Sequence, residues 1–247
     1  MNNAFKLNLM RTAKNNLNDQ DKDIPLEGSF RGFERQIEDW FTLYFGLYFL
    51  DYYRINKTIC IDIGAFKGLY SSVYARHFSY VHAFEASPYA CLHSKSNFKR
   101  QQIPNITLHE IGILNYSGTA VFNQQFTSEK KFHIRGTSSF NLDVHSSEPK
   151  NFVEQINLPV RPLDSFKLHP SFLKIDADGT ELKILEGGFD TISKSLPFIQ
   201  AETCLQDSEK IDDFLFKIGY KKINLSDFSY IYPNLDSIKD SFYIYSE

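Results

Sequence analysis

Four acidic residues directly follow short apolar runs, where their side chains can face a ligand. Asp62 follows TICI, Glu85 follows VHAF, Asp176 follows SFLKI and Glu202 follows PFIQA. If these runs are parallel strands, their carboxyl ends meet at one edge of a sheet, and ligands bind in the crevice outside that edge. Carboxylates there can accept hydrogen bonds from hydroxyl groups or take a proton from one.

Two glycines, Gly64 and Gly68, follow Asp62 in the segment DIGAFKG. They permit a tight turn and a close ligand approach, and the helix that follows offers unpaired N–H groups. Glu85 lies 17 residues beyond Gly68, a spacing that suits an acceptor for both ribose hydroxyls. A dinucleotide fingerprint needs a third glycine, but position 66 is Phe. The pattern therefore predicts a nucleoside site and disfavours a nicotinamide dinucleotide.

The segment DADGTELKILEGG carries a second group of acids. Asp178 and Glu181 have the spacing of a helix cap, and we expect one helix from about residue 180 to 196. Asp176 is not needed for capping. It ends the strand expected beside the first one, where a substrate would meet the nucleoside. Glu202 should be its neighbour on the next strand. The apolar face expected for that helix comprises Leu182, Leu185, Phe189, Ile192 and Leu196.

Six segments in order resemble the successive blocks of the FkbM-type S-adenosylmethionine-dependent methyltransferases, over roughly residues 58 to 205. They are IDIGAFKG, HAFEASP, TSSF, RPLDSF, LKIDADGTELKILEGG and PFIQAE. The resemblance implies a class I methyltransferase fold, and O-methylation of a sugar or polyketide hydroxyl. Asp178 stands where the family usually has Glu, so the resemblance gives this position no direct role.

With S-adenosylmethionine as the cofactor, the amino-acid end should lie against residues 64–68 and the ribose against Glu85. Asp176 should orient or deprotonate the acceptor hydroxyl, and a divalent metal, if one is bound, should be held by Asp176 and Glu202. His133, Arg135 and Ser138 are expected to bind the acceptor. The residues expected to bind the cofactor are Asp62, Gly64, Ala65, Phe66, Gly68, Glu85, Ala86, Ile111, Gly112 and Ser139.

Apolar runs alternate with helical stretches from Thr58 onward, an order that predicts an α/β fold with a parallel sheet and right-handed crossovers. The family resemblance implies a Rossmann-like class I methyltransferase domain, which we expect over residues 58–247, with a seven-stranded, mostly parallel sheet and helices on both faces. The regular order lapses over about 113–163, which predicts a β-rich insertion that forms the acceptor wall. Residues 1–57 should form an N-terminal helical extension.

The composition is that of a globular protein, with 42% hydrophobic residues and a net charge of −3. This charge gives no general attraction to nucleic acid, and the small-molecule substrate that we expect is implied by the family resemblance. The apolar run WFTLYFGLYFL (residues 40–50) is too short to cross a bilayer, and no secretory signal is recognisable, so we expect a cytoplasmic protein. The aromatic helix containing this run should pack on the main domain, and the alternatives are a homodimer contact or a membrane-surface helix.

The leading function is therefore O-methylation of a carbohydrate hydroxyl, on a sugar nucleotide or a surface-glycan precursor of capsule or lipopolysaccharide. Two alternatives remain at this point. One is a nicotinamide-dependent sugar oxidoreductase on a related fold, although the glycine pattern counts against it. The other is a non-catalytic methyltransferase-like module retained for assembly, since a fold does not establish a function.

Overall fold

The computed structural model describes residues 42–43, 45–126, 134, 136–141, 153–203, 207–228 and 240–246. The chain divides into two compact units, each described by itself. The smaller comprises Met1–Ile55 with Asn224–Ile238, and the larger comprises Asn56–Ile223 with Lys239–Glu247. The larger unit begins two residues before the boundary expected at residue 58. The division into an N-terminal helical extension over residues 1–57 and a domain over residues 58–247 stays a prediction.

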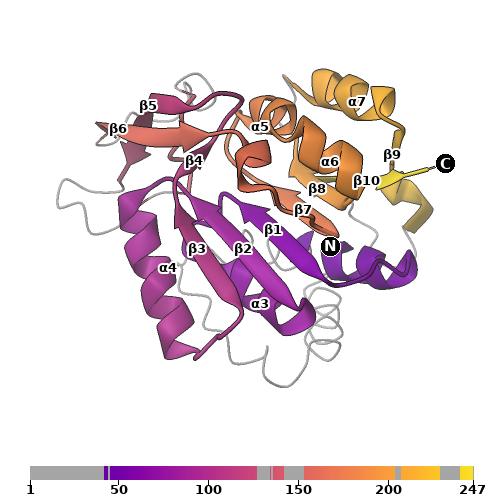
Figure 1. Ribbon diagram of the computed structural model, residues 1–247, viewed down its shortest axis with the longest axis horizontal. Helices are drawn as coiled ribbons and strands as arrows, with labels where there is room; N and C mark the ends of the chain where they lie inside the picture. The colour runs from indigo at the N-terminus through magenta and orange to yellow at the C-terminus, as the bar shows by residue number, and fades with distance from the viewer. Residues whose placement is uncertain are drawn as a thin grey trace, which may run out of the picture. The chain divides into compact units, whose positions relative to one another are not determined.

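A seven-stranded sheet forms the centre of the larger unit, in the order β3-β2-β1-β7-β8-β10-β9 (Figure 1). The first five strands in this order run parallel, and β10 is antiparallel to both of its neighbours. This arrangement confirms the predicted class I methyltransferase fold. The strands span β1 Ile59–Ile63, β2 Tyr80–Glu85, β3 Ile106–Glu110, β7 Phe172–Ile175, β8 Phe198–Glu202, β9 Tyr220–Lys222 and β10 Asp240–Tyr245.

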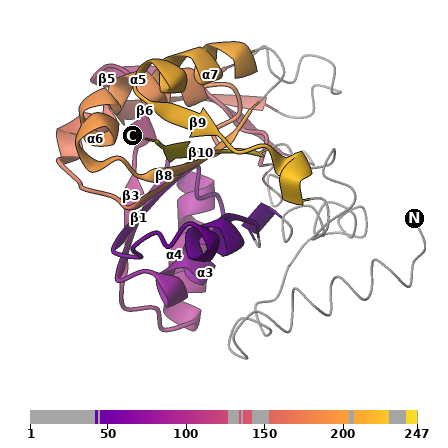
Figure 2. The same ribbon diagram turned by 90° about the vertical axis from the view of Figure 1, so that its right-hand side faces the viewer.

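Helices cover both faces of this sheet, as predicted (Figure 2). The helices α3 (Leu69–His77) and α4 (Pro88–Arg100) lie on one face. The other face carries α5 (Glu181–Gly187), α6 (Phe189–Ser195) and α7 (Ser208–Lys217). Buried isoleucine, leucine and aromatic side chains from the central strands and the helices form a core cluster.

The residues expected to form one helix over 180–196 form two helices, α5 and α6. The prediction of a single continuous helix is therefore wrong. Gly187 lies against the backbone of Leu114, and a Cβ there would be 2.3 Å from the Leu114 carbonyl oxygen. The chain turns at Gly188, which ends α5 and precedes α6. As a result, Phe189 and Leu196 leave the expected apolar face and are 45% and 40% exposed.

The insertion forms a second, three-stranded sheet in the order β4-β6-β5, with β4 (Gly112–Ile113), β5 (Gly118–Gln125) and β6 (Val153–Arg161). β5 pairs antiparallel with β6, and β4 pairs parallel with it. Since β4 directly follows the carboxyl end of β3, this sheet lies at the ligand-binding edge (Figure 1). The predicted β-rich insertion is therefore present. The 3-10 turn η2 (Leu163–Phe166) leads from it to β7.

In the smaller unit, the described part of the aromatic segment is helical over residues 42–43 and 45–52. Phe49 and Tyr52 contact Phe228 of the 3-10 turn η3 (Leu225–Phe228) edge-on, with ring centroids 5.0 and 5.4 Å apart. Homodimerisation through this helix stays a prediction. No helix within the described ranges is both long and apolar enough to cross a membrane.

Cys60 and Cys91, in the larger unit, are buried free thiols.

Candidate functional site

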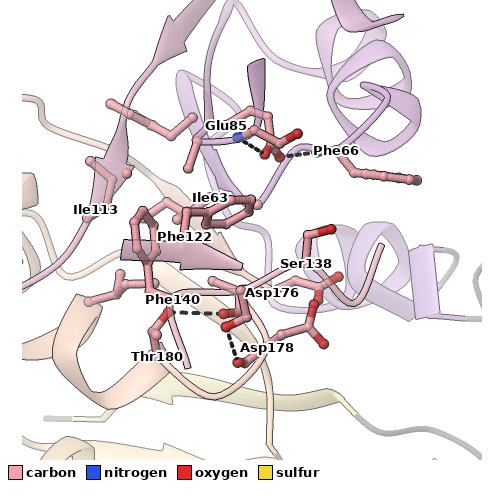
Figure 3. A pocket seen from close by; sticks show the side chains of 18 of the residues that line it. Ile63, Phe66, Glu85, Ile113, Phe122, Ser138, Phe140, Asp176, Asp178 and Thr180 are labelled. Carbon is pink, nitrogen blue, oxygen red and sulfur yellow. Dashed lines mark hydrogen bonds between the residues drawn. The ribbon is translucent and has the colours of Figure 1, made fainter. Parts of the chain in front are cut away.

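A pocket lies at the carboxyl ends of the central strands, between them and the insertion (Figure 3). Its cavity volume is about 60 Å³. The lining residues are Ile63, Gly64, Phe66, Phe84, Glu85, Ala86, Ser87, Ile111, Gly112, Ile113, Phe122, Gly136, Ser138, Ser139, Phe140, Asp176, Ala177, Asp178, Thr180 and Ile184.

Glu85 ends β2 and presents its carboxylate to this pocket, although its side chain is only 8% exposed. One oxygen accepts the Phe66 N–H and the other accepts the Ser87 N–H, each at 2.7 Å (Figure 3). Burial raises the pKa of Glu85 to about 7, and these two hydrogen bonds oppose the rise. A carboxylate has about four lone-pair sites, so acceptor capacity remains for a ligand's hydroxyl groups.

The glycine turn joins the ends of β1, β2 and β7. The Gly64 and Ala65 N–H groups both donate to the Phe84 carbonyl oxygen, at 3.0 and 3.1 Å. Gly64 has a φ of +81°, and a Cβ there would lie 1.7 Å from the carbonyl oxygen of Asp176. Glycine is therefore required at position 64 by the close approach of the protein's own backbone, and the predicted close approach of a ligand stays a prediction.

Three of the expected cofactor residues, Asp62, Ala65 and Gly68, do not line the pocket. Asp62 is fully buried and accepts a hydrogen bond from the Ser71 hydroxyl at 2.5 Å, which ties β1 to α3. Gly68 precedes α3, and a Cβ there would be 2.5 Å from the Phe98 ring of α4. Asp62 and Gly68 thus support the turn from within the fold, and the cofactor contacts expected of these three residues stay a prediction.

Phe66, the residue that breaks the dinucleotide pattern, adopts a left-handed conformation with a φ of +49°. Its ring lines the pocket and packs against a small apolar cluster of Ala90, Phe126 and Ile134. A bulky residue with positive φ is strained, and such strain persists where the surroundings fix it. The ring therefore links the glycine turn to the insertion.

Serines of the TSSF segment tie the insertion to the pocket. Ser138 accepts hydrogen bonds from the Gln124 side-chain amide at 2.8 Å and the Gln125 N–H at 2.9 Å. The Ser139 hydroxyl donates to the Asp178 carbonyl oxygen at 2.7 Å. Both serines line the pocket as expected, but these hydroxyl groups already hold the wall together.

An aromatic pair, Phe122 and Phe140, covers the part of the pocket next to Gly112 (Figure 3). The two rings meet edge-on, with centroids 4.9 Å apart. A Cβ on Gly112 would be 2.5 Å from the Phe140 ring, so the ring lies directly on this turn. This pair was not predicted, although Phe140 is the last residue of TSSF and Phe122 lies in the expected β-rich insertion.

Asp176 and Asp178 line the opposite part of the pocket (Figure 3). The expected cap is wrong, because Thr180 precedes α5 and Asp178 has a left-handed φ of +47°. Glu181 does reach back, accepting the N–H groups of Ala177 and Gly179 at 3.1 and 3.2 Å. Burial raises the pKa of Glu181 to about 7. Glu181 therefore shapes the loop that presents the two aspartates.

Glu202 ends β8 as predicted but does not line the pocket. Burial, and then the charges of Asp176 and Asp178, raise its pKa to about 9, so it carries a proton at pH 7 and hydrogen bonds with Asp176. Within the described ranges, no three histidine, cysteine or acidic side chains group to hold a metal ion. The expected metal site at Asp176 and Glu202 is therefore not supported.

The remaining predicted residues divide into two groups. Ala86, Ile111 and Gly112 line the pocket as expected. His133 and Arg135 lie outside the described residues, so their acceptor role stays a prediction.

The comparisons with known proteins agree with this architecture. The family model described as "Methyltransferase FkbM domain" matches residues 62–222. The chain belongs to this family. Membership favours methyl transfer over the nicotinamide-dependent alternative and implies S-adenosylmethionine as the methyl donor. No curated protein matches the chain.

Solved structures resemble the chain distantly. An FkbM methyltransferase from Methylobacillus flagellatus matches with a TM-score of 0.49 and 15% identity, over 97% of this chain and 59% of that one. A precorrin-6y C5,15-methyltransferase from Geobacter metallireducens matches with a TM-score of 0.46 and 16% identity, over 82% and 81%. A ribosomal protein L11 methylase from Lactobacillus delbrueckii subsp. bulgaricus matches at 0.48 and 8%, over 84% and 79%.

The pocket residues fit S-adenosylmethionine by their chemistry. Glu85 retains acceptor capacity for ribose hydroxyls, and Ile111, Phe122 and Phe140 offer an apolar wall suited to a purine ring. Gly64 lets the backbone of the turn lie close to the Asp176 carbonyl group. These residues come from β1, β2, the end of β3 and the insertion.

Proposed function

We propose that this protein is an S-adenosylmethionine-dependent O-methyltransferase whose acceptor is a carbohydrate hydroxyl, on a sugar nucleotide or a surface-glycan precursor. One observation carries the proposal. Glu85 and Asp176 line a single pocket from the ends of β2 and β7, on either side of the Gly64 turn. The hydroxyl acceptor comes from the family resemblance rather than from an individual contact.

Glu85 and the aromatic pair hold the nucleoside part of the cofactor. The Glu85 carboxylate accepts the ribose hydroxyls through the lone pairs that Phe66 and Ser87 leave open. Phe122 and Phe140 cover the purine and exclude water from it. The bound cofactor supplies a methyl group on a positively charged sulfur.

Asp176 acts on the acceptor. Its carboxylate orients the hydroxyl group by accepting its hydrogen bond, and it takes the proton as the oxygen–methyl bond forms. An ordinary aspartate has a reference pKa of about 3.9, far below that of an alcohol, so this proton moves late in the transition state. In-line positioning of the hydroxyl therefore supplies most of the acceleration.

The test uses the full chain with isotopically labelled S-adenosylmethionine and a panel of sugar nucleotides and free glycans. Mass spectrometry should detect an acceptor heavier by one methyl group. Asp176→Asn should bind the cofactor as the native protein does but turn over roughly a hundredfold more slowly. Arg135→Ala should raise the KM for a phosphorylated acceptor without changing cofactor affinity.

Each outcome separates the alternatives. Cofactor binding without methylation of any hydroxyl acceptor would favour the non-catalytic assembly module. Full activity of Asp176→Asn would remove its catalytic role, and methylation on nitrogen or carbon would refute the hydroxyl acceptor. A lack of cofactor binding would overturn the whole proposal.

A further inference from the structure

Lys174 is a buried lysine at the carboxyl end of β7 that the proposed chemistry does not yet use. Its side chain is 2% exposed. Its ammonium nitrogen lies 3.0 Å from Asp176 Oδ2 and 3.7 Å from Asp62 Oδ1, and 4.5 Å from the centroid of the Tyr70 ring. Every one of these neighbours belongs to the ligand-binding end of β1, α3 or β7.

The ammonium keeps its charge despite its burial. Burial opposes that charge, but the carboxylates of Asp176, Asp62 and Asp240 outweigh the burial and raise the pKa of Lys174 above its ordinary value. Taking such a group out of water is costly unless a partner compensates for it. Leucine or methionine at this position would fill similar space, but it would leave the buried Asp62 carboxylate without its counter-charge. The charge therefore needs an explanation beyond packing.

The two carboxylates that flank Lys174 differ in their access to the pocket. Asp62 is fully buried and pairs in register with Lys174 across β1 and β7. The Asp176 side chain is 38% exposed and lines the pocket. Lys174 donates a hydrogen bond to Asp176 and lies beyond hydrogen-bond distance of Asp62. The Lys174 ammonium therefore lies between the buried Asp62 carboxylate and the Asp176 carboxylate, which faces the pocket.

We propose that Lys174 is a positioning residue that holds the Asp176 carboxylate in the orientation needed to receive the acceptor hydroxyl. This inference rests on the proposed function, because it assigns the lysine a role through Asp176. The competing role is charge balance alone, in which Lys174 only neutralises Asp62. The two roles predict different results when Asp62 and Lys174 are changed together.

The experiment compares the native protein with Lys174→Met, Lys174→Arg and the double variant Lys174→Met with Asp62→Asn. Cofactor Kd is measured by calorimetry, and kcat and acceptor KM by methyl transfer. For Lys174→Met we expect a cofactor Kd within about threefold of native and a kcat lower by about a hundredfold, as for a misplaced reacting group. The kcat of Lys174→Arg should be at least tenfold higher than that of Lys174→Met.

The double variant decides between the two roles. If Lys174 positions Asp176, the double variant stays as slow as Lys174→Met. If it only balances Asp62, turnover returns toward the native value, and the proposal is overturned. Lys194→Met, which removes an exposed lysine paired with Asp190, serves as the matched control and should behave as native.

A readout that does not need turnover keeps this proposal separate from the proposed function. Melting temperatures are measured for Lys174→Met, Asp176→Asn and the variant carrying both changes. A coupled pair makes the combined loss smaller than the sum of the single losses. Additive losses would overturn the role of Lys174 even if no acceptor is methylated. Failure of both Lys174→Met and its Asp62→Asn double variant to fold would also overturn it, in favour of a purely structural role.

Discussion

Glu85 links cofactor binding to pH at the scale of one residue. Its pKa is raised to about 7, mainly by burial, so below pH 7 the carboxyl is mostly protonated and above it mostly ionised. The ionised form is the better acceptor for two ribose hydroxyls. We therefore expect cofactor affinity to rise between pH 6 and pH 8 by about fivefold to tenfold.

Calorimetry at both pH values checks this expectation. Glu85→Gln, which keeps the shape but cannot ionise, should bind more weakly and show no such rise. An equally steep rise in Glu85→Gln would assign the pH dependence to another group.

Gly64 sets a steric limit at the centre of the site. A methyl group there would overlap the Asp176 carbonyl oxygen at 1.7 Å, and its φ of +81° is unfavourable for alanine. Gly64→Ala should therefore lower the free energy of unfolding by about 4 kcal/mol or more, which is large for one substitution. Denaturant unfolding measures the loss.

Gly136→Ala is the matched control for this change. Its added Cβ would meet its nearest neighbour, the Phe66 ring, at an ordinary contact distance of 3.9 Å. Equal stability of Gly64→Ala and Gly136→Ala would contradict this expectation. It would mean that β1 and β7 can move apart at the turn without a cost in free energy.

Some residues could be predicted from sequence, and others could not, for a physical reason. Gly64, Glu85 and Asp176 follow apolar runs, and this local pattern places them at strand ends. The pattern does not distinguish Asp62, which faces inward to Ser71, from Asp176, which faces the pocket. That difference depends on which side chains of other elements cover each residue.

At the scale of elements, the main strands and crossovers were predictable because their periodicity is local. The break between α5 and α6 was not, since it depends on the approach of Gly187 to Leu114, 73 positions earlier in the chain. The aromatic wall was missed for the same reason. Phe122 and Phe140 meet only when the insertion folds back onto itself.

Phe140 is where the insertion should affect cofactor binding most directly. Its ring lies on Gly112 and against Phe122. Phe140→Ala removes an aromatic contact that is typically worth about 0.5–1.5 kcal/mol beyond its buried area. We expect cofactor Kd to rise by about tenfold, measured by calorimetry.

Tyr116→Ala provides the control, because Tyr116 belongs to the insertion but is 45% exposed and does not line the pocket. It should leave cofactor Kd unchanged. Equal affinities of native protein and Phe140→Ala would place the purine elsewhere.

At the scale of the whole molecule, Glu202 should make the fold less stable in alkaline solution. Its pKa rises from an ordinary 4.5 to about 9, so the folded protein binds this proton more tightly than the unfolded chain. The contribution of this proton to the free energy of unfolding is fully present below pH 4.5 and is lost progressively as the pH rises to 9. Between pH 7 and 9 the loss should stay below about 1.4 kcal/mol per pH unit.

Denaturant unfolding at pH 7, 8 and 9 measures this slope. Glu202→Gln removes the titrating group, so its stability should change less over the same range. An unchanged slope in Glu202→Gln would mean that other groups cause the loss.

The strand order has a consequence for solubility. With a net charge of only −3, copies of the protein repel one another weakly. The main sheet ends in β3 and β9, and strand edges of this kind can pair with another chain and start aggregation. β9 has only three residues, and two of them are the exposed lysines Lys221 and Lys222. β3 ends at Glu110, which forms an ion pair with Lys95. The short length of β9 and the local charge at both edges therefore disfavour pairing of these strands with another chain, an effect that the overall charge does not supply.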